Sequence, residues 1–235
     1  MHQGGKLLLK ITTITLPLPY RLGSVNCYLI ETGTGYLLID TGSSNQRTAL
    51  EKQLESAGCT PGNLDLIILT HGDFDHTGNA GYLRETFATQ IAMHHDDTGM
   101  AERGDMFWNR ERGNLVLRGV APILFGFGKS ERFTPDLYLK DADTLKDYGF
   151  DAQVIALPGH SRGSIGILTG EGDLICGDLL ENNNQPDFNS IMDDRVAAEA
   201  SVEKLRPLGI KTVYPGHGQP FPMAQFVLND PSPNE

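Results

Sequence analysis

The strongest constraint on this chain is a cluster of four side chains able to bind metal within six residues, His71, Asp73, Asp75 and His76. They follow the apolar run 64–69, which is typical of a buried strand. If the segment stays extended, alternate residues point to one side, so His71, Asp73 and Asp75 share a face, and His76 turns toward the helix that follows. Nothing structural requires so many ionisable groups here. The cluster therefore indicates one half of a metal site.

Three more side chains of the same chemistry stand just past later apolar runs of the chain. They are His160, Asp178 and His217, and a glycine directly precedes each of them. Glycine permits tight turns and a close approach of neighbouring groups. These residues predict the second half of the metal site, at the ends of strands.

The order of these residues resembles the motifs of the metallo-β-lactamase superfamily of binuclear metallohydrolases. The resemblance extends from Asn26 to His217. The family's first motif is usually His-x-His-x-Asp-His, followed by a single His, a bridging Asp and a last His. It implies that the first metal is bound by His71 and His160, the second by Asp75, His76 and His217, and that Asp178 bridges them.

Asp73 is the departure from this pattern, because it occupies the place of the usual second histidine. Its position predicts a ligand of the first metal. With Asp73, Asp75 and Asp178 ionised, three negative charges face the two ions, so the site is less positive than the common one and attracts anionic substrates less. A harder oxygen ligand also shifts preference from zinc toward manganese or iron. We expect two divalent metal ions as cofactors, zinc or manganese or iron.

Two divalent ions lower the pKa of a shared water, orient it and polarise the bond that it attacks. Asp75 is the candidate catalytic residue, because a carboxylate there serves as a metal ligand or as the proton acceptor for that water. Asp40 ends the apolar run 37–39 and is the candidate to hold the second nitrogen of a ligand histidine. The alternative for Asp40 is a turn residue before Gly42.

Length and composition predict a single domain over residues 1–235. The 3 cysteines are too few for a disulfide framework, which favours a reducing compartment, the cytoplasm. The net charge of −11 opposes binding to nucleic acid. The run 6–18 is interrupted by Lys10 and three threonines, so an opening strand is favoured over a signal peptide, and no run is long enough to cross a membrane.

Hydrophobic periodicity predicts strands and helices in both halves of the chain. The strands are 25–31, 36–40, 64–70, 90–93, 153–157, 165–169, 174–176 and 211–214. The first helix begins at a capping box of Ser43 with Gln46 and stops at Gly58, and two more span 79–87 and 194–206. The pattern alone predicts an α+β protein. The family resemblance implies an αββα sandwich of two mixed β-sheets flanked by helices.

The segment 94–135, called the lid segment below, is rich in glycine and large apolar residues. Between Met106 and Arg132 it carries five basic and two acidic residues in an otherwise acidic chain. A lid over the metals predicts Met106, Phe107 and Trp108 as substrate-binding residues. The alternative is a helix that packs on the sandwich or against a second subunit of a homodimer.

We expect a metal-dependent hydrolase of a small ester, thioester or lactone, with the activated water as nucleophile. Glyoxalase II-like thioesterases share the Pro158 to Ser164 style of motif, but only the residues 218–235 follow His217, too few for their helical carboxy-terminal region. Flavodiiron oxidoreductases, which place a glutamate where Asp73 stands, are the alternative in another enzyme class. A metal-binding domain without turnover is the third alternative.

Overall fold

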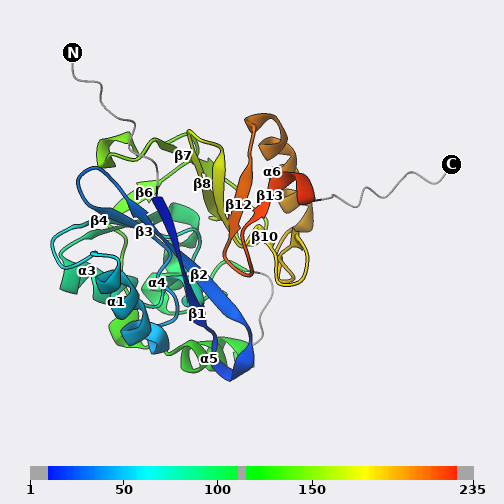
Figure 1. The fold of residues 1–235 in the computed structure, drawn as a ribbon. Coiled ribbons are helices and arrows are strands. Elements are labelled where there is room, and N and C mark those ends of the chain that lie inside the picture. The colour runs from blue at the N-terminus through cyan, green and yellow to red at the C-terminus, as the bar shows by residue number, and fades with distance from the viewer. Residues whose placement is uncertain (1–9, 111–114, 227–235) are drawn as a thin grey trace, which may run out of the picture.

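Two β-sheets stacked face to face form the centre of the molecule, with helices on both outer sides (Figure 1). A computed structural model describes residues 10–110 and 115–226. The first sheet has the order β1-β2-β3-β4-β5-β6 and the second the order β13-β12-β9-β8-β7. Both sheets contain parallel and antiparallel pairs, so both are mixed.

The first sheet uses the amino-terminal half of the chain and the second sheet the carboxy-terminal half. The strands of the first are β1 (Lys10–Pro17), β2 (Ser24–Glu31), β3 (Tyr36–Ile39), β4 (Leu64–Ile68), β5 (Gln90–His94) and β6 (Leu137–Leu139). Those of the second are β7 (Ala152–Ala156), β8 (Ile165–Thr169), β9 (Asp173–Gly177), β12 (Thr212–Pro215) and β13 (Phe221–Pro222). A short hairpin pairs β10 (Leu180–Glu181) with β11 (Asp187–Phe188).

Side-chain alternation along the strands divides the core into three layers. On β3, Leu37 and Ile39 enter the cluster between the two sheets, whereas Leu38 packs on the opposite face with Leu50 and Leu54. The third cluster covers the outer face of the second sheet and includes Ala198 and Val202. Because successive side chains of a strand point to opposite faces, a strand buried on both faces is apolar throughout. The layers are those of the predicted αββα sandwich.

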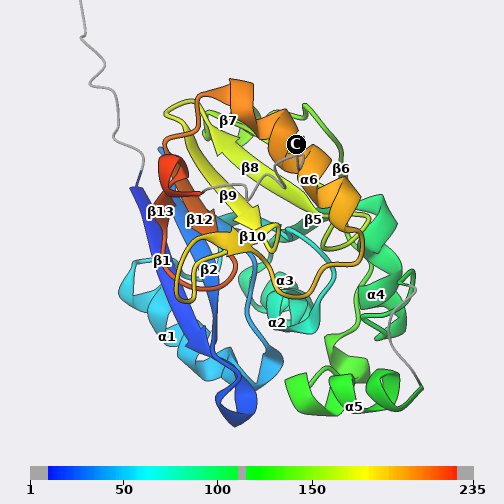
Figure 2. The ribbon, with the colours of Figure 1, turned by 90° about the vertical axis from the view of Figure 1, so that its right-hand side faces the viewer.

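Helices cover the outer faces of both sheets, as two perpendicular views show (Figures 1 and 2). The six α-helices among the described residues are α1 (Arg47–Ser56), α2 (Phe74–Thr77), α3 (Ala80–Phe87), α4 (Thr98–Arg103), α5 (Leu115–Phe125) and α6 (Arg195–Leu205). The helices α1 and α3 lie on the first sheet and α6 lies on the second. None of the described helices is both long and apolar enough to cross a membrane.

Two local predictions about the first half are wrong. Ser43 makes no side-chain capping hydrogen bond, because the backbone N–H of Gln46 donates instead to the carbonyl of Ser43 at 2.9 Å. A 3₁₀ turn precedes α1, which begins only at Arg47. The segment after β4 is not extended as far as Asp75. The strand ends at Ile68, and Asp75 and His76 already belong to the one-turn helix α2.

The lid segment connects β5 to β6 and contains α4 and α5. Residues 111–114 of it, the opening residues 1–9 and the final residues 227–235 lie outside the described residues. Helix α5 leaves Leu115, Val116 and Ile123 exposed, whereas Ala121 on the same helix is buried. This apolar face is where the predicted homodimer contact would lie, and the homodimer stays a prediction.

Candidate metal centre

Loops at one end of the sandwich bring the seven predicted metal ligands together from both sheets. His71 and Asp73 lie in the turn after β4, and Asp75 and His76 in α2. The other three follow strands of the second sheet, His160 after β7, Asp178 after β9 and His217 after β12. Along the chain, the first of these ligands is His71 and the last is His217. The fold therefore joins the two halves of the motif.

The donor atoms form two compact groups, and Asp178 connects them. One group is His71, His160 and Asp178, and the other is Asp75, His76 and His217; within each group the donor atoms all lie within 4.8 Å of one another. Asp178 Oδ2 lies 3.9 Å from His71 Nε2 and 3.2 Å from His217 Nε2, and its Oδ1 lies 3.4 Å from His76 Nε2. A carboxylate that faces imidazoles of both groups is placed as a bridging ligand would be.

The chemistry of these donors fits divalent metal ions. His71 Nε2, His76 Nε2 and Asp178 Oδ1 are buried and have no hydrogen-bond partner. Buried polar atoms in proteins are nearly always paired, so three unpaired acceptors at one spot are what a cation-binding site would present. Imidazole and carboxylate donors suit zinc, iron and manganese.

The second nitrogen of each of the four histidines is held by another group. His160 Nδ1 donates to the carbonyl of Ile191 at 2.6 Å and His217 Nδ1 to that of Ser24 at 2.7 Å. His76 Nδ1 lies 2.8 Å from Asp40 Oδ2. His71 Nδ1 lies 2.9 Å from Thr70 Oγ1, whose hydroxyl donates to Asp40 Oδ2. These contacts turn every Nε2 atom toward the centre of the site.

Asp40 serves a histidine of each group, directly for His76 and through Thr70 for His71. We therefore expect Asp40→Ala to weaken metal binding by about 10- to 100-fold, the usual effect of removing a group that orients a ligand. The measurement is competition for metal with a chromophoric chelator. Asp65→Ala is the matched control, because Asp65 lies near the start of β4, whereas the metal ligands follow the end of that strand. Equal affinities for the two variants would contradict an orienting role for Asp40.

Asp73 lies beside the first group and is shared between that group and an arginine. Its Oδ2 is 3.0 Å from His160 Nε2 and 3.8 Å from His71 Nε2, while its Oδ1 is 2.8 Å from Arg110 Nη1. Arg110 was absent from the site predicted by sequence, where it counted only as one of five basic residues in the lid segment. An arginine that precedes Glu111 and Arg112 carries no signal that separates it from its neighbours.

Electrostatics keep His71 and Asp73 in the forms that bind metal. Burial lowers the pKa of His71 well below its ordinary value, and the imidazoles of His76 and His160 add to this effect. Burial alone would raise the pKa of Asp73, but Arg110 and His160 favour the carboxylate and hold that pKa well below its usual range. His71 is thus neutral and Asp73 ionised at neutral pH.

Asp97 is a buried carboxylate that sequence reasoning also missed. It connects the loop of His71 to the loop of His160. Its Oδ2 accepts from the backbone N–H of Gly72 at 3.1 Å and from Ser161 Oγ at 2.6 Å. Its Oδ1 accepts from the backbone N–H of Gly163 at 2.8 Å. Burial raises the pKa of Asp97. Nothing in the sequence distinguishes Asp97 from its exposed neighbour Asp96.

Gly216, the residue before His217, must be glycine for a steric reason. A Cβ added at position 216 would overlap Asp178 Oδ1 and come within 2.8 Å of His76 Cε1. As the sequence suggested, the glycine before His217 permits a close approach. Here the backbone approaches Asp178, the proposed bridging ligand.

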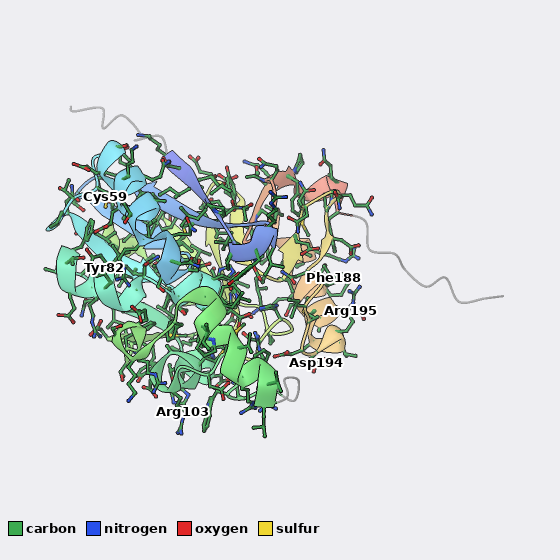
Figure 3. All side chains as sticks on the ribbon, turned by 90° about the horizontal axis from the view of Figure 1, so that it is seen from below. Cys59, Tyr82, Arg103, Phe188, Asp194 and Arg195 are labelled. Atoms are coloured by element: carbon green, nitrogen blue, oxygen red, sulfur yellow. The ribbon has the colours of Figure 1, made fainter. Side chains whose placement is uncertain are left out.

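The three predicted substrate-binding residues have contacts with other parts of the protein. Met106 and Phe107 are partly buried and pack against the core of the first sheet. Trp108 is 42% exposed, and the guanidinium of Arg103 lies 3.6 Å from its ring centroid. Arg103 is labelled on the lower part of Figure 3. Their role in substrate binding stays a prediction, and the packing of Met106 and Phe107 favours the structural alternative for them.

Comparisons with known proteins identify a family, two relatives and a solved structure that this chain resembles. The model of the metallo-beta-lactamase superfamily matches residues 20–217. A hydroxyacylglutathione hydrolase of Haemophilus influenzae is 28% identical, over 88% of this chain and 91% of that protein. An acyl-coenzyme A thioesterase of Bos taurus is 27% identical, over 85% of this chain and 71% of that protein. A solved structure in a di-iron-bound form is 28% identical with a TM-score of 0.67, covering 89% of this chain and 96% of the other.

Proposed function

Because this chain belongs to the metallo-beta-lactamase superfamily, we propose that it is a hydrolase that uses two divalent metal ions to cleave a small ester, thioester or lactone. The observation that carries the proposal is the pair of donor groups joined by Asp178, with its three orphaned buried acceptors. When bound, two divalent ions supply Lewis acidity and lower the pKa of a water molecule. The proposed ligands are the seven residues predicted from the sequence.

Asp75 is the proposed catalytic residue. It is the carboxylate of the second donor group, and a carboxylate there can accept a proton from the attacking water. Its Oδ2 lies 3.6 Å from His217 Nε2 and 3.9 Å from His76 Nε2. Burial raises the pKa of Asp75 above its ordinary value. A bound divalent ion opposes this effect of burial, so the proposed role rests on the position of Asp75 in the second donor group rather than on its pKa. The chain thus keeps a base at the second group, while Asp40 and the backbone carbonyls hold the imidazoles in place.

An acyl substrate is supported by the names of two relatives, a hydroxyacylglutathione hydrolase and an acyl-coenzyme A thioesterase. A cavity of about 650 Å³ adjoins the site, with a lining that includes Arg110, Ser161, Arg162 and Asp193. Small-molecule pockets usually have volumes of this order. None of the proposed metal ligands lines the cavity, but Gly159 and Ser161, on either side of His160, do. We propose that it receives the part of the substrate remote from the scissile bond.

The test is an assay of metal-replete protein against an ester, a thioester and a lactone, with metal content measured in the same sample. Zinc, manganese and iron are each supplied in turn, because a relative has been solved in a di-iron-bound form. The expected result is turnover of at least one acyl compound that stops on chelation and returns with metal. Oxygen consumption without acyl turnover would replace the hydrolase proposal by the flavodiiron-like alternative. Metal binding with neither activity would favour a binding domain without turnover.

Trp108 gives a prediction for the lid segment. We expect Trp108→Ala to raise KM or lower kcat/KM while metal content stays unchanged, since the change removes contact area but no ligand. Its partial exposure limits the loss of stability to the order of a cation–π contact, about 1 kcal/mol. Kinetics and thermal unfolding of the same variant separate the two effects. A large fall in the melting temperature with unaltered kinetics would make Trp108 a structural residue.

A further inference from the structure

Arg110 is a buried cation built into the candidate metal centre. Its side chain is only 2% exposed. Arg110 Nη1 lies 2.8 Å from Asp73 Oδ1, Nε lies 2.8 Å from Asp193 Oδ2, and Nη2 donates to the carbonyl of His160 at 3.4 Å. Removing a charge from water is costly unless it is paired and hydrogen-bonded. Burying a guanidinium here therefore costs desolvation free energy. Its contacts with Asp73, Asp193 and the carbonyl of His160 offset that cost.

Both oxygens of Asp73 lie close to Arg110. Oδ1 is 2.8 Å from Arg110 Nη1, whereas Oδ2 accepts a hydrogen bond from the same nitrogen at 3.1 Å and also lies 3.0 Å from His160 Nε2 and 3.8 Å from His71 Nε2. The guanidinium and the first donor group therefore share Oδ2. Planar guanidinium groups suit this contact because their N–H groups hold a carboxylate in a defined plane.

The charge of the site changes once Arg110 is included. Counting Asp73, Asp75 and Asp178 alone gave three negative charges facing two ions. The guanidinium adds one positive charge in direct contact with Asp73, so the pair of Asp73 and Arg110 has no net charge, like a neutral histidine. We therefore no longer expect Asp73 to make this site less positive than the common one, because Arg110 balances its charge. The oxygen donor remains, but its extra negative charge is neutralised.

We propose that Asp73 and Arg110 act as one unit in place of a neutral histidine, in which Arg110 is a positioning residue that neutralises Asp73 and holds its carboxylate beside the first donor group. The inference rests on the proposed binuclear centre. It adds to that centre a group from the lid segment, one that balances the charge of Asp73 when no metal is bound.

A metal-dependent difference in stability follows. Without metal, Arg110 is the one arginine or lysine among the described residues that contacts Asp73. With metal, the ion becomes a second counter-ion for the same carboxylate. Removing the guanidinium should therefore harm the metal-free protein more than the loaded protein, because the metal replaces the lost positive charge.

The experiment compares melting temperatures of the full-length chain saturated with Zn²⁺ or Mn²⁺ and after chelation, for the parent protein and Arg110→Met. We expect the rise in melting temperature on metal addition to be at least twice as large in Arg110→Met as in the parent. Arg110→Lys retains the charge without the fork of N–H groups, so its rise should be intermediate. If Arg110→Met does not fold, the lysine variant provides the same comparison.

The matched control is Arg118→Met, which removes another arginine of the lid segment. Arg118 lies 3.0 Å from Asp105 Oδ2 and donates to the carbonyl of Phe107, but contacts none of the proposed ligands. It should lower the melting temperature equally with and without metal. The same equal loss in Arg110→Met would show that Arg110 only anchors the segment, and would overturn the proposal.

A pair of variants tests the exchange with histidine directly. Asp73→His leaves the guanidinium facing the metals without its carboxylate, so metal affinity measured by chelator competition should fall about tenfold or more. Adding Arg110→Met to Asp73→His should restore most of that loss. If the second change gives no recovery, the two residues do not act as a unit. Absence of any metal effect in the parent protein would instead overturn the metal centre itself, an outcome distinct from failure of this inference.

Discussion

Asp178→Ala is expected to lose both metal ions and to abolish turnover of whichever acyl compound the parent protein cleaves. Among the carboxylates of the described residues, Asp178 alone faces imidazoles of both donor groups, at 3.2 Å from His217 Nε2, 3.4 Å from His76 Nε2 and 3.9 Å from His71 Nε2. Without its charge, the two ions would repel each other with no carboxylate between them. Since removing a group that merely orients a ligand costs about 10- to 100-fold in metal affinity, loss of the bridge should exceed 100-fold. Elemental analysis and kcat/KM measure the two effects.

Two further variants place limits on this expectation. His160→Ala should retain more metal than Asp178→Ala, because a water molecule can take the place of one terminal ligand. Asp187→Ala, which removes an exposed aspartate of the neighbouring hairpin, should leave metal content unchanged. Retention of both metals and of near-normal turnover by Asp178→Ala would show that the bridge has been assigned to the wrong residue.

Asp97→Ala is expected to destabilise the protein by about 3 kcal/mol or more. The substitution leaves the N–H groups of Gly72 and Gly163 and the hydroxyl of Ser161 without their acceptor, and each unsatisfied buried donor costs about 1 to 3 kcal/mol. Urea unfolding of metal-free protein measures the loss. Because Gly72 follows His71 and Ser161 follows His160, metal affinity should fall as well.

The adjacent aspartate provides the control for Asp97. The side chain of Asp96 is 53% exposed, so Asp96→Ala should change the free energy of unfolding by less than about 0.5 kcal/mol. A comparable loss for both variants would mean that the network around Asp97 carries little of the stability of the ligand loops.

The fold and the arrangement of the ligand motifs could be predicted because both depend on local patterns. Apolar runs that are buried on both faces gave the strands, and the glycines beside His160, Asp178 and His217 marked turns at strand ends. The two-residue strands β10, β11 and β13 were missed, because pairing rather than periodicity defines them. The capping box at Ser43 failed because the backbone N–H of Gln46 donates to the carbonyl of Ser43 in a 3₁₀ turn rather than to its hydroxyl.

The groups that support the ligands could not be predicted in the same way. Asp97 reaches residues of two loops, one of them 64 residues away in the sequence, and Arg110 reaches His160 across 50 residues. Side-chain contacts over such separations leave no periodic signal. Asp40 was a candidate only because it ended a strand, and its link to His71 through Thr70 depends on a register between strands that no single segment contains.

Each donor group takes residues from both sheets, with consequences for the order of folding. His71 comes from the first sheet and is grouped with His160 and Asp178 of the second, while Asp75 and His76 are grouped with His217. Neither half of the chain holds a complete set, so a metal ion can be captured in full only after the two sheets have docked. Metal uptake is thus a late event in folding. In the opposite direction, any opening that separates the two sheets divides both donor groups, so bound metal would oppose that opening.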